Sequence, residues 1–149
     1  MTEAVVGVLG AGRVGIRLSP FSNANGISDS NPQPLFEYVV GKLNGFGLAY
    51  LHMVEGQTGG PRELPEGTSI EALRKLFDGI YIANNGYTRD MAIDAVESGK
   101  VDLVAFGRTF IANPDLVERL KRDAPLNATF YGGGAKGYTD YPFLSDKVA

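Results

Sequence analysis

Short apolar runs recur along the chain, and each is followed by a polar turn and then by a pattern typical of a helix. The four runs are Val14–Ser19, Leu48–Val54, Ile80–Ala83 and Leu103–Phe106. They are nearly continuous in apolar residues, as expected for strands that are buried on both faces of a parallel sheet. The pattern therefore predicts four β-strands.

The segments between these runs predict the helices. Within Pro32–Asn44, apolar residues recur at helical spacing. Thr68 and Glu71 have the spacing of a capping box, which predicts a helix from there to near Phe77. Thr88 is expected to cap a helix that reaches Glu97. The run Asn113-Pro114-Asp115 is expected to open the last helix, with proline at its first position.

Strict alternation of strand and helix predicts an α/β fold in which helices cover a parallel sheet. Four such units fit either a small doubly wound sheet or half of an eight-stranded β/α barrel, and their spacing does not separate the two. Residues 1–12 read as the end of a preceding helix and residues 13–122 as the four units. Residues 123–149 form a segment rich in glycine and tyrosine.

Gly10, Gly12 and Gly15 match the dinucleotide fingerprint G-x-G-x-x-G. That fingerprint needs a strand before the glycines and a helix after them, but Pro20 and several turn residues follow Gly15 closely. We therefore expect residues 2–9 to be the tail of a helix that stops at the glycines, and residues 14–19 to be a strand.

Composition excludes several classes of function. The 149 residues carry a formal net charge of −3, which gives no basic surface for nucleic acid or an anionic membrane. No apolar stretch is long enough to span a bilayer, and Glu3 stands where a signal peptide would be basic. The absence of cysteine and the single histidine exclude disulfides and any two-histidine metal site. These absences lead us to expect a cytoplasmic protein without a metal.

Five segments together carry a family resemblance: VGIRLSP from Val14, AYLHMVEG from Ala49, IANNGYT from Ile82, AFGRTFIANPDLVERL from Ala105 and FYGGGAKGYTDYP from Phe130. In this order and spacing they resemble the C-terminal half of the old yellow enzyme family, the flavin-dependent ene reductases. The resemblance covers essentially the whole chain.

The resemblance implies an FMN-binding (β/α)8 TIM barrel, of which this chain supplies strands five to eight with their helices. Members of that family take hydride from NADPH or NADH onto the flavin and pass it to the β-carbon of an activated alkene. Strands one to four would then be absent. We expect Met1, which is followed by mid-helix sequence, to be an engineered start or the start of a gene fragment.

Four residues are candidates for holding the FMN phosphate. Asn85 and Gly86 follow the third predicted strand, and Gly107 and Arg108 follow the fourth. Barrel enzymes often hold a phosphate in the loops after their last two strands, where glycine lets the backbone approach closely. The resemblance implies that backbone amides at these positions hold the phosphate. The alternative is that they are ordinary turn residues.

Three further residues are implied to lie at the flavin. Arg17, inside an apolar strand, matches the family arginine that stabilises negative charge on the reduced N1–O2 edge, although a structural ion pair is the alternative. Phe130 and Tyr131 match the pair that flanks the flavin, and Tyr131 would border the substrate pocket. Packing of the C-terminal segment is the alternative for Phe130. Tyr138 and Tyr141 are expected to be structural.

Two titratable residues of the second predicted strand are expected to be structural. His52, the single histidine, lies in the apolar run Leu48–Val54, and such a residue is more often a satisfied core group than a catalyst. Glu55 at the end of that strand is expected to make a loop or helix-cap contact.

The resemblance implies no catalytic residue within this half. The histidine–asparagine or histidine–histidine pair that anchors the substrate carbonyl in the family lies on strands of the other half, as does the tyrosine that donates the proton. A half-barrel would leave unpaired strand edges and an apolar interior face. We therefore expect the chain to pair with the complementary N-terminal half, or with a second copy of itself.

Three functions remain open at this stage. The first is one half of an FMN-dependent ene reductase, inactive without its complement. The second is a non-enzymatic flavin- or phosphate-binding half-barrel module that self-associates. The third is an unrelated nucleotide-binding α/β protein, which the broken glycine fingerprint disfavours.

Overall fold

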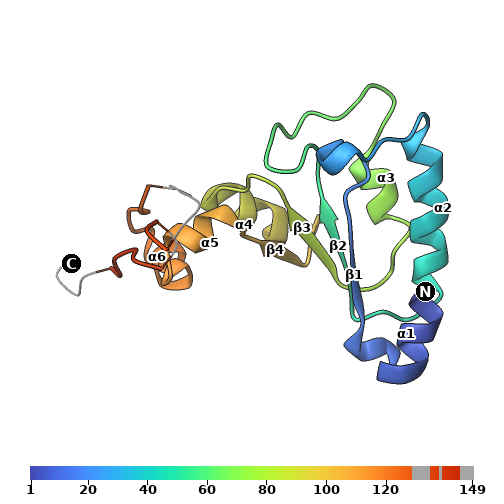
Figure 1. The fold of residues 1–149 in the computed structure, drawn as a ribbon, viewed down its shortest axis with the longest axis horizontal. Coiled ribbons are helices and arrows are strands. Elements are labelled where there is room, and N and C mark those ends of the chain that lie inside the picture. Colours follow the sequence, from blue (N-terminus) through green and yellow to red (C-terminus); the bar gives the residue numbers. More distant parts are fainter. Residues whose placement is uncertain (129–134, 138, 145–149) are drawn as a thin grey trace. The chain divides into compact units, whose positions relative to one another are not determined.

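Four parallel strands form one sheet in the order in which they occur along the chain (Figure 1). The computed structural model describes residues 1–128, 135–137 and 139–144. The strands are β1 (Gly15–Leu18), β2 (Tyr50–Val54), β3 (Tyr81–Asn84) and β4 (Leu103–Ala105). A doubly wound sheet reverses its strand order at a switch point. This sheet has no such reversal, and its order is that of an arc of a β/α barrel.

One helix precedes β1, and helices follow every strand. They are α1 (Thr2–Leu9), α2 (Pro32–Asn44), α3 (Ile70–Arg74), α4 (Arg89–Glu97), α5 (Arg108–Ala112) and α6 (Leu116–Arg122), with 3-10 turns η1 (Ala11–Arg13) and η2 (Ala24–Gly26). The chain divides into two compact units, residues 1–105 and 106–149. The first unit holds the whole sheet with α1 to α4, and the second holds α5 and α6.

The core of the first unit lies on one face of the sheet. Leu51, Met53 and Ala83 are fully buried there against Val40 of α2 and Leu73 of α3. Side chains alternate across a strand, so the residues between these core positions lie on the opposite face. That opposite face carries polar and half-exposed side chains, among them Arg17 and His52. The candidate site uses these residues, the loops at the carboxyl edge of the sheet, and Tyr81 from the core face.

The four predicted strands are confirmed to within two residues at each end, and α2 occupies the predicted residues. The predicted cap at Thr88 is also confirmed, because its hydroxyl accepts the Met91 amide at 3.3 Å and α4 ends at Glu97. Apolar periodicity and a single capping residue were sufficient for these elements, since both are local signals.

The predicted capping box at Thr68 is wrong by one residue. Ser69 caps α3, and its hydroxyl accepts the Ala72 amide at 3.1 Å. The Thr68 hydroxyl instead donates to the Pro65 carbonyl at 2.6 Å, because the preceding loop turns back on itself there. Glu71 forms an exposed ion pair with a lysine one turn later. The helix is short and ends at residue 74, before the predicted end near Phe77.

The prediction that Asn113 opens the last helix is wrong, because α6 begins at Leu116 with Asp115 as its N-cap. A short helix that was not predicted, α5, ends directly before Asn113. The Asn113 side chain is buried and donates to the Thr109 carbonyl at 2.8 Å, so it closes α5. Its other side-chain atom, Oδ1, accepts the Asn127 amide at 2.8 Å. Asp115 precedes α6 but makes no side-chain cap bond, because its carboxylate is engaged with Arg119.

The glycines of the broken fingerprint have structural roles, as expected. Gly10 ends α1, Gly12 lies in η1 and β1 begins at Gly15, so the glycines lead into a strand and not into a helix. Gly15 pairs in register with Tyr50 of β2. A Cβ at Gly15 would lie 2.2 Å from the Tyr50 ring, so a larger residue there would require that ring to turn away.

Candidate functional site

The loop after β3 turns at Asn85 and Gly86, whose φ angles are 113° and 64°. Glycine adopts positive φ freely, whereas asparagine does so at a cost. Asn84, the last residue of β3, pairs in register with Val54 of β2 and Ala105 of β4. The turn therefore lies at the carboxyl edge of the sheet, where β/α barrels bind their ligands.

Two contacts hold Asn85 in this conformation. Its side-chain amide donates to the Glu55 backbone carbonyl at 2.7 Å, and its own carbonyl accepts from Arg62 Nη1 at 2.5 Å. Asn85 is buried, and so is its bond to Glu55, whereas the bond from Arg62 is only partly buried. The turn that is a candidate phosphate site is thus hydrogen-bonded to the residue that follows β2 and to Arg62 in the loop after it.

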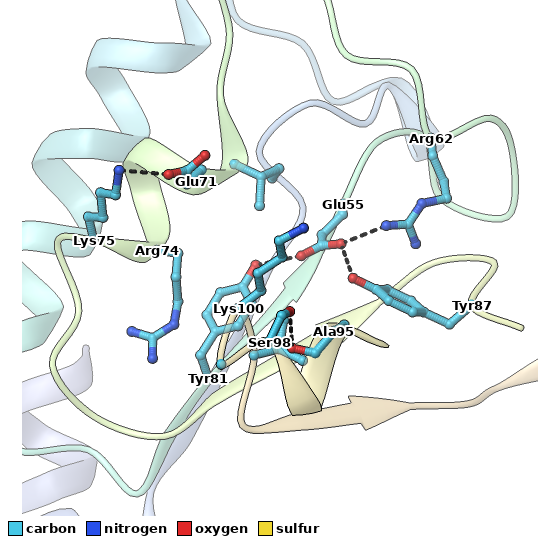
Figure 2. A pocket seen from close by; sticks show the side chains of 13 residues that line it. Glu55, Arg62, Glu71, Arg74, Lys75, Tyr81, Tyr87, Ala95, Ser98 and Lys100 are labelled. Carbon is cyan, nitrogen blue, oxygen red and sulfur yellow. Dashed lines mark hydrogen bonds and ion pairs between the residues drawn. The ribbon is translucent and has the colours of Figure 1, made fainter. Parts of the chain in front are cut away.

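The Glu55 carboxylate is the centre of a buried network, which Figure 2 shows. It accepts from the Tyr81 hydroxyl at 3.0 Å and from the Tyr87 hydroxyl at 2.7 Å, and it pairs with Arg62 Nη2 at 3.1 Å. Burial, together with the negative charge and hydrogen bond of Glu55, raises the pKa of Tyr81. Burial also raises the pKa of Tyr87. Both hydroxyls therefore keep their protons as donors.

A cavity of ≈ 600 Å³ lies beside this network, between the sheet and helices α3 and α4. Glu55, Arg62 and both tyrosines line the cavity. Residues of α3, of α4 and of the loop after α4, Lys100 among them, complete the lining. Glu55 was expected to make a loop contact, and its carboxylate contacts one arginine and two tyrosines from different parts of the first unit.

Arg17 lies on the open face of the sheet. Its Nη2 donates to Asn84 Oδ1 at 3.3 Å, across β2, and the Asn84 amide donates to the Ala105 carbonyl at 2.7 Å. Among the residues that the structure describes, no carboxylate forms an ion pair with Arg17. The guanidinium is therefore an exposed cation held by an uncharged partner, beside the strand that leads into the Asn85 turn.

His52 pairs in register with Arg17 on the same face. Its Nε2 atom is buried and has no hydrogen-bond partner among the described residues. Burial and then the charge of Arg17 lower the pKa of His52 below 6.5. The imidazole is therefore neutral at pH 7, which leaves Arg17 as the positive charge on this part of the face.

The remaining candidate residues belong to the second unit. Gly107 precedes α5, Arg108 is its first residue, and both are exposed. Phe130 and Tyr131, like Tyr138, lie outside the described residues. Tyr141 is half-buried in the second unit.

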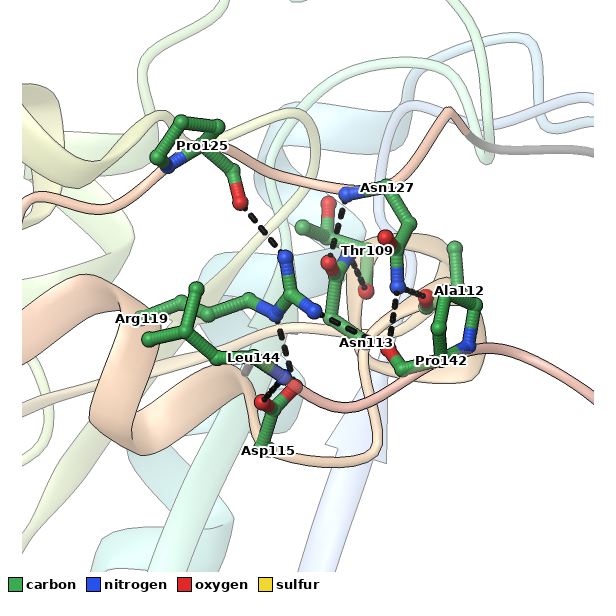
Figure 3. Close-up of polar contacts among 9 residues, drawn as sticks. All are labelled: Thr109, Ala112, Asn113, Asp115, Arg119, Pro125, Asn127, Pro142 and Leu144. Carbon is green, nitrogen blue, oxygen red and sulfur yellow. Dashed lines mark hydrogen bonds and ion pairs between the residues drawn. The ribbon is translucent and has the colours of Figure 1, made fainter. Parts of the chain in front are cut away.

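The second unit has a polar network of its own (Figure 3). Arg119 is 4% exposed; its Nε pairs with Asp115 at 2.7 Å, and its two Nη atoms donate to the Pro125 and Pro142 carbonyls at 2.6 and 2.9 Å. Asp115 also accepts the Leu144 amide at 2.5 Å. This network joins α6 to the backbone at Pro125, Pro142 and Leu144.

Sequence reasoning assigned no role to four residues of the site: Asn84, Arg62 and the two tyrosines that bind Glu55. Asn84 was visible as the first asparagine of the run that ends in Gly86, directly after a strand. Arg62 carried no local signal, because it lies in a glycine- and proline-rich loop and reaches Asn85 only through the path of that loop.

A model of the NADH:flavin oxidoreductase / NADH oxidase family matches residues 1–127. The chain belongs to this family. The putative 12-oxophytodienoate reductase 11 of Oryza sativa subsp. japonica is 46% identical over 156 residues, which cover 99% of this chain and 42% of that protein. The 12-oxophytodienoate reductase 2 of Arabidopsis thaliana is 43% identical over 150 residues, covering 97% of this chain and 40% of that protein.

Solved structures agree. The old yellow enzyme from Trypanosoma cruzi matches with a TM-score of 0.85 at 40% identity, over 97% of this chain and 38% of that one. Morphinone reductase matches with a TM-score of 0.84 at 43% identity, over 99% and 41%. The chain thus spans about two fifths of the length of these relatives. The resemblance to old yellow enzymes is confirmed, and with it the family's cofactor, FMN, with NADH or NADPH as reductant.

The turns named above have the chemistry to meet a flavin phosphate. A Cβ at Gly86 would find no atom nearer than Arg62 Cδ at 4.0 Å, and one at Gly107 would find none within 4 Å. The backbone at each glycine is open to close approach, and turn amides are good donors to anions. Each turn, taken by itself, therefore has backbone chemistry that suits an anion such as the phosphate group of FMN.

In the described part of the chain, no helix has the length and apolar character needed to cross a bilayer. The same residues contain no cluster of three acidic or imidazole side chains that could hold a metal ion.

Proposed function

We propose that this chain is the C-terminal half of the barrel of an FMN-dependent ene reductase and contributes the FMN phosphate site. One observation carries the proposal: the Arg17 guanidinium is hydrogen-bonded to Asn84 directly beside the Asn85–Gly86 turn, at the carboxyl edge of a parallel sheet. The Asn85–Gly86 turn suits the phosphate end of flavin mononucleotide, and the fixed cation of Arg17 suits the flavin ring at its other end.

In this proposal the backbone amides at Asn85, Gly86, Gly107 and Arg108 hold the phosphate. The support is that each pair follows a strand, that β3 and β4 are adjacent and parallel, and that each glycine is open to a ligand. Amide donors and a nearby arginine favour a doubly charged anion over the uncharged riboflavin end.

Arg17 stabilises negative charge at the flavin ring. His52, its register partner on β2, is neutral and adds no second charge to this part of the face. When bound, FMN supplies the hydride chemistry that joins NADH or NADPH to an activated alkene such as an enone. Phe130 and Tyr131 are proposed to flank the flavin, with Tyr131 at the substrate pocket, on the strength of the family likeness alone.

The four strands are proposed to be strands five to eight of an eight-stranded barrel, closed by a complementary N-terminal half. Tyr50, Ile80 and Leu103 lie on the open face and are 38%, 47% and 52% exposed. Such a face favours a partner that covers it. Activity is proposed to require that partner, since the family's substrate-anchoring pair and proton-donating tyrosine have no match in this sequence.

The test is a fluorescence titration of FMN and of riboflavin with the purified chain. Preferential quenching of FMN is expected, because only FMN carries the phosphate. A Gly86→Val variant is expected to abolish the preference, since its side chain fills the open approach and strains a backbone with φ of 64°. Equal binding of both flavins by the wild-type chain would contradict the phosphate site.

A second function is favoured by the exposed face and by β1 and β4, which have no further strand paired to them within the described residues. It is a non-enzymatic flavin- or phosphate-binding module that self-associates through that face. FMN binding by a homodimer, with no alkene reduction after the complementary half is added, would favour this function over the first.

A further inference from the structure

Asn85 is the strained residue of the phosphate turn, and its neighbours must hold it in place. A φ of 113° is outside the regions that residues with a side chain favour. Left alone, this turn would relax to another conformation, and its amides would then point elsewhere. The groups that bond to Asn85 therefore decide which way the turn presents its donors.

The bond from Arg62 to the Asn85 carbonyl has a direct geometric consequence. That carbonyl and the Gly86 N–H belong to one planar trans peptide unit, in which C=O and N–H point in opposite directions. Arg62 Nη1 holds the carbonyl at 2.5 Å on its own side. The Gly86 amide is thereby aimed away from Arg62, and it is one of the donors assigned to the phosphate.

Arg62 is itself fixed on three sides. Its Nη2 pairs with Glu55 at 3.1 Å, and its guanidinium lies over the Tyr87 ring at 4.1 Å. Tyr87 and Tyr81 bind the same carboxylate through their hydroxyls, so Glu55 is held from both of its oxygens. Glu55 is 8% exposed, so solvent screens its ion pair with Arg62 less than it would screen a pair on the surface.

Only the forked guanidinium can make these contacts together. It donates through one nitrogen to Asn85 and through another to Glu55, while its flat face rests on an aromatic ring. A lysine ammonium is a point charge without a planar face, and it is unsuited to this double contact.

We infer that Arg62 is a positioning residue of the FMN phosphate turn, with Glu55, Tyr81 and Tyr87 as the buried support that orients it. The inference rests on the proposed function for the identity of the anion. It goes beyond that proposal because it names a side chain outside the turn, Arg62, as the group that sets the orientation of the Gly86 amide.

The test compares Arg62→Met and Arg62→Lys with the wild-type chain and with Lys75→Met. Lys75 is a matched control because it carries the same charge in an exposed ion pair with Glu71. The first readout is the NMR order parameter of the Asn85 and Gly86 amides without flavin. The second is the ratio of the dissociation constants of riboflavin and FMN.

In both Arg62 variants the order parameters of the turn are expected to fall from the rigid value of about 0.85 to below about 0.6. The preference for FMN over riboflavin is expected to drop about tenfold, as for one lost charge-assisted hydrogen bond. Riboflavin binding and the Lys75→Met variant are expected to be unchanged. Circular dichroism checks that each variant is folded, and Tyr87→Phe, expected to act in the same direction but less, replaces any variant that is not.

The outcomes separate the two proposals. If the turn stays ordered in Arg62→Met, or if Arg62→Lys behaves as wild type, the positioning role is wrong even where FMN is preferred. If the turn loses order while the preference for FMN is kept, the link to the phosphate is wrong. If the wild-type chain does not prefer FMN, the proposed function fails, and loss of order in the variants still supports the positioning of the turn by Arg62.

Discussion

Arg62 and Arg119 use the same chemistry in the two units for different purposes. Each pairs with one carboxylate and turns further N–H groups toward backbone carbonyls. Arg119 is 4% exposed and binds the carbonyls of two separate segments, so it closes the second unit on itself. The Arg62 side chain stays 33% exposed and binds one carbonyl, beside the open Gly86 amide. The buried guanidinium of Arg119 joins segments of the chain. The partly exposed guanidinium of Arg62 instead orients a backbone group that is proposed to bind a ligand.

The largest effect is expected from Arg119→Met. The change removes the donor of the Pro125 carbonyl and one of the two donors of the Pro142 carbonyl, and it leaves the Asp115 carboxylate without its ion-pair partner. It should lower the free energy of unfolding by about 3 kcal/mol. Urea denaturation followed by circular dichroism measures it. Arg122→Met is the control, because Arg122 lies on the same helix in an exposed pair with Glu118 and should cost less than about 0.5 kcal/mol. If the two variants lost the same free energy of unfolding, the buried network would contribute no more to stability than the exposed ion pair does.

A smaller loss, of about 2 kcal/mol, is expected from Tyr81→Phe. The variant keeps the ring but removes the hydroxyl that donates to the buried Glu55 carboxylate. The same denaturation experiment measures the change. Tyr38→Phe serves as the control, since Tyr38 is 66% exposed on α2. A stability equal to that of the wild type would mean that Glu55 does not depend on this donor.

Alkaline pH should weaken the first network selectively. Burial and the charge of Glu55 raise the pKa of Tyr81 above 10 in the folded chain. Its contribution to stability is therefore fully present below about pH 10 and declines as the pH rises further, because the unfolded chain loses this proton first. The free energy of unfolding should fall more between about pH 9 and 11 in the wild type than in Tyr81→Phe. Parallel curves for the two proteins would contradict this.

Acid should weaken the second network instead. Although burial acts to raise it, the pKa of Asp115 lies below 3.8, because the Arg119 guanidinium and the Leu144 amide bond to the carboxylate. This contribution is present above about pH 4 and is lost as the pH falls through the folded-state pKa. Asp115→Asn should therefore be less sensitive than the wild type between about pH 5 and 3, as measured by urea denaturation at each pH. A variant as acid-sensitive as the wild type would contradict the role of Asp115.

The two networks also differ in how far the sequence reveals them. Asp115 and Arg119 are four residues apart on a helix, a spacing at which opposite charges meet. Glu55 and Arg62 are seven residues apart in a loop, and the two tyrosines that bind Glu55 lie 26 and 32 residues further along the chain. No periodicity connects those positions, so only the folded loop brings them together.

The sequence by itself determined the alternation of strands and helices, the extents of α2 and α4, and the failure of the glycine fingerprint. These are matters of apolar period, capping and a proline, all of which act over a few residues. It also placed Asn85 and Gly86 after a strand, and family motifs pointed to FMN.

The spacing of the elements left the doubly wound and the sequential sheet open, and only the family resemblance implied a barrel. The tertiary structure decided for the sequential order, since the order of strands depends on how the crossovers pack. It also decided that Ser69 rather than Thr68 caps α3, and that Asn113 closes a helix instead of opening one. In each case the outcome depends on which backbone group a polar side chain meets after folding. Arg62 follows the same rule, because its partner Asn85 is defined by the path of a loop and not by any local pattern.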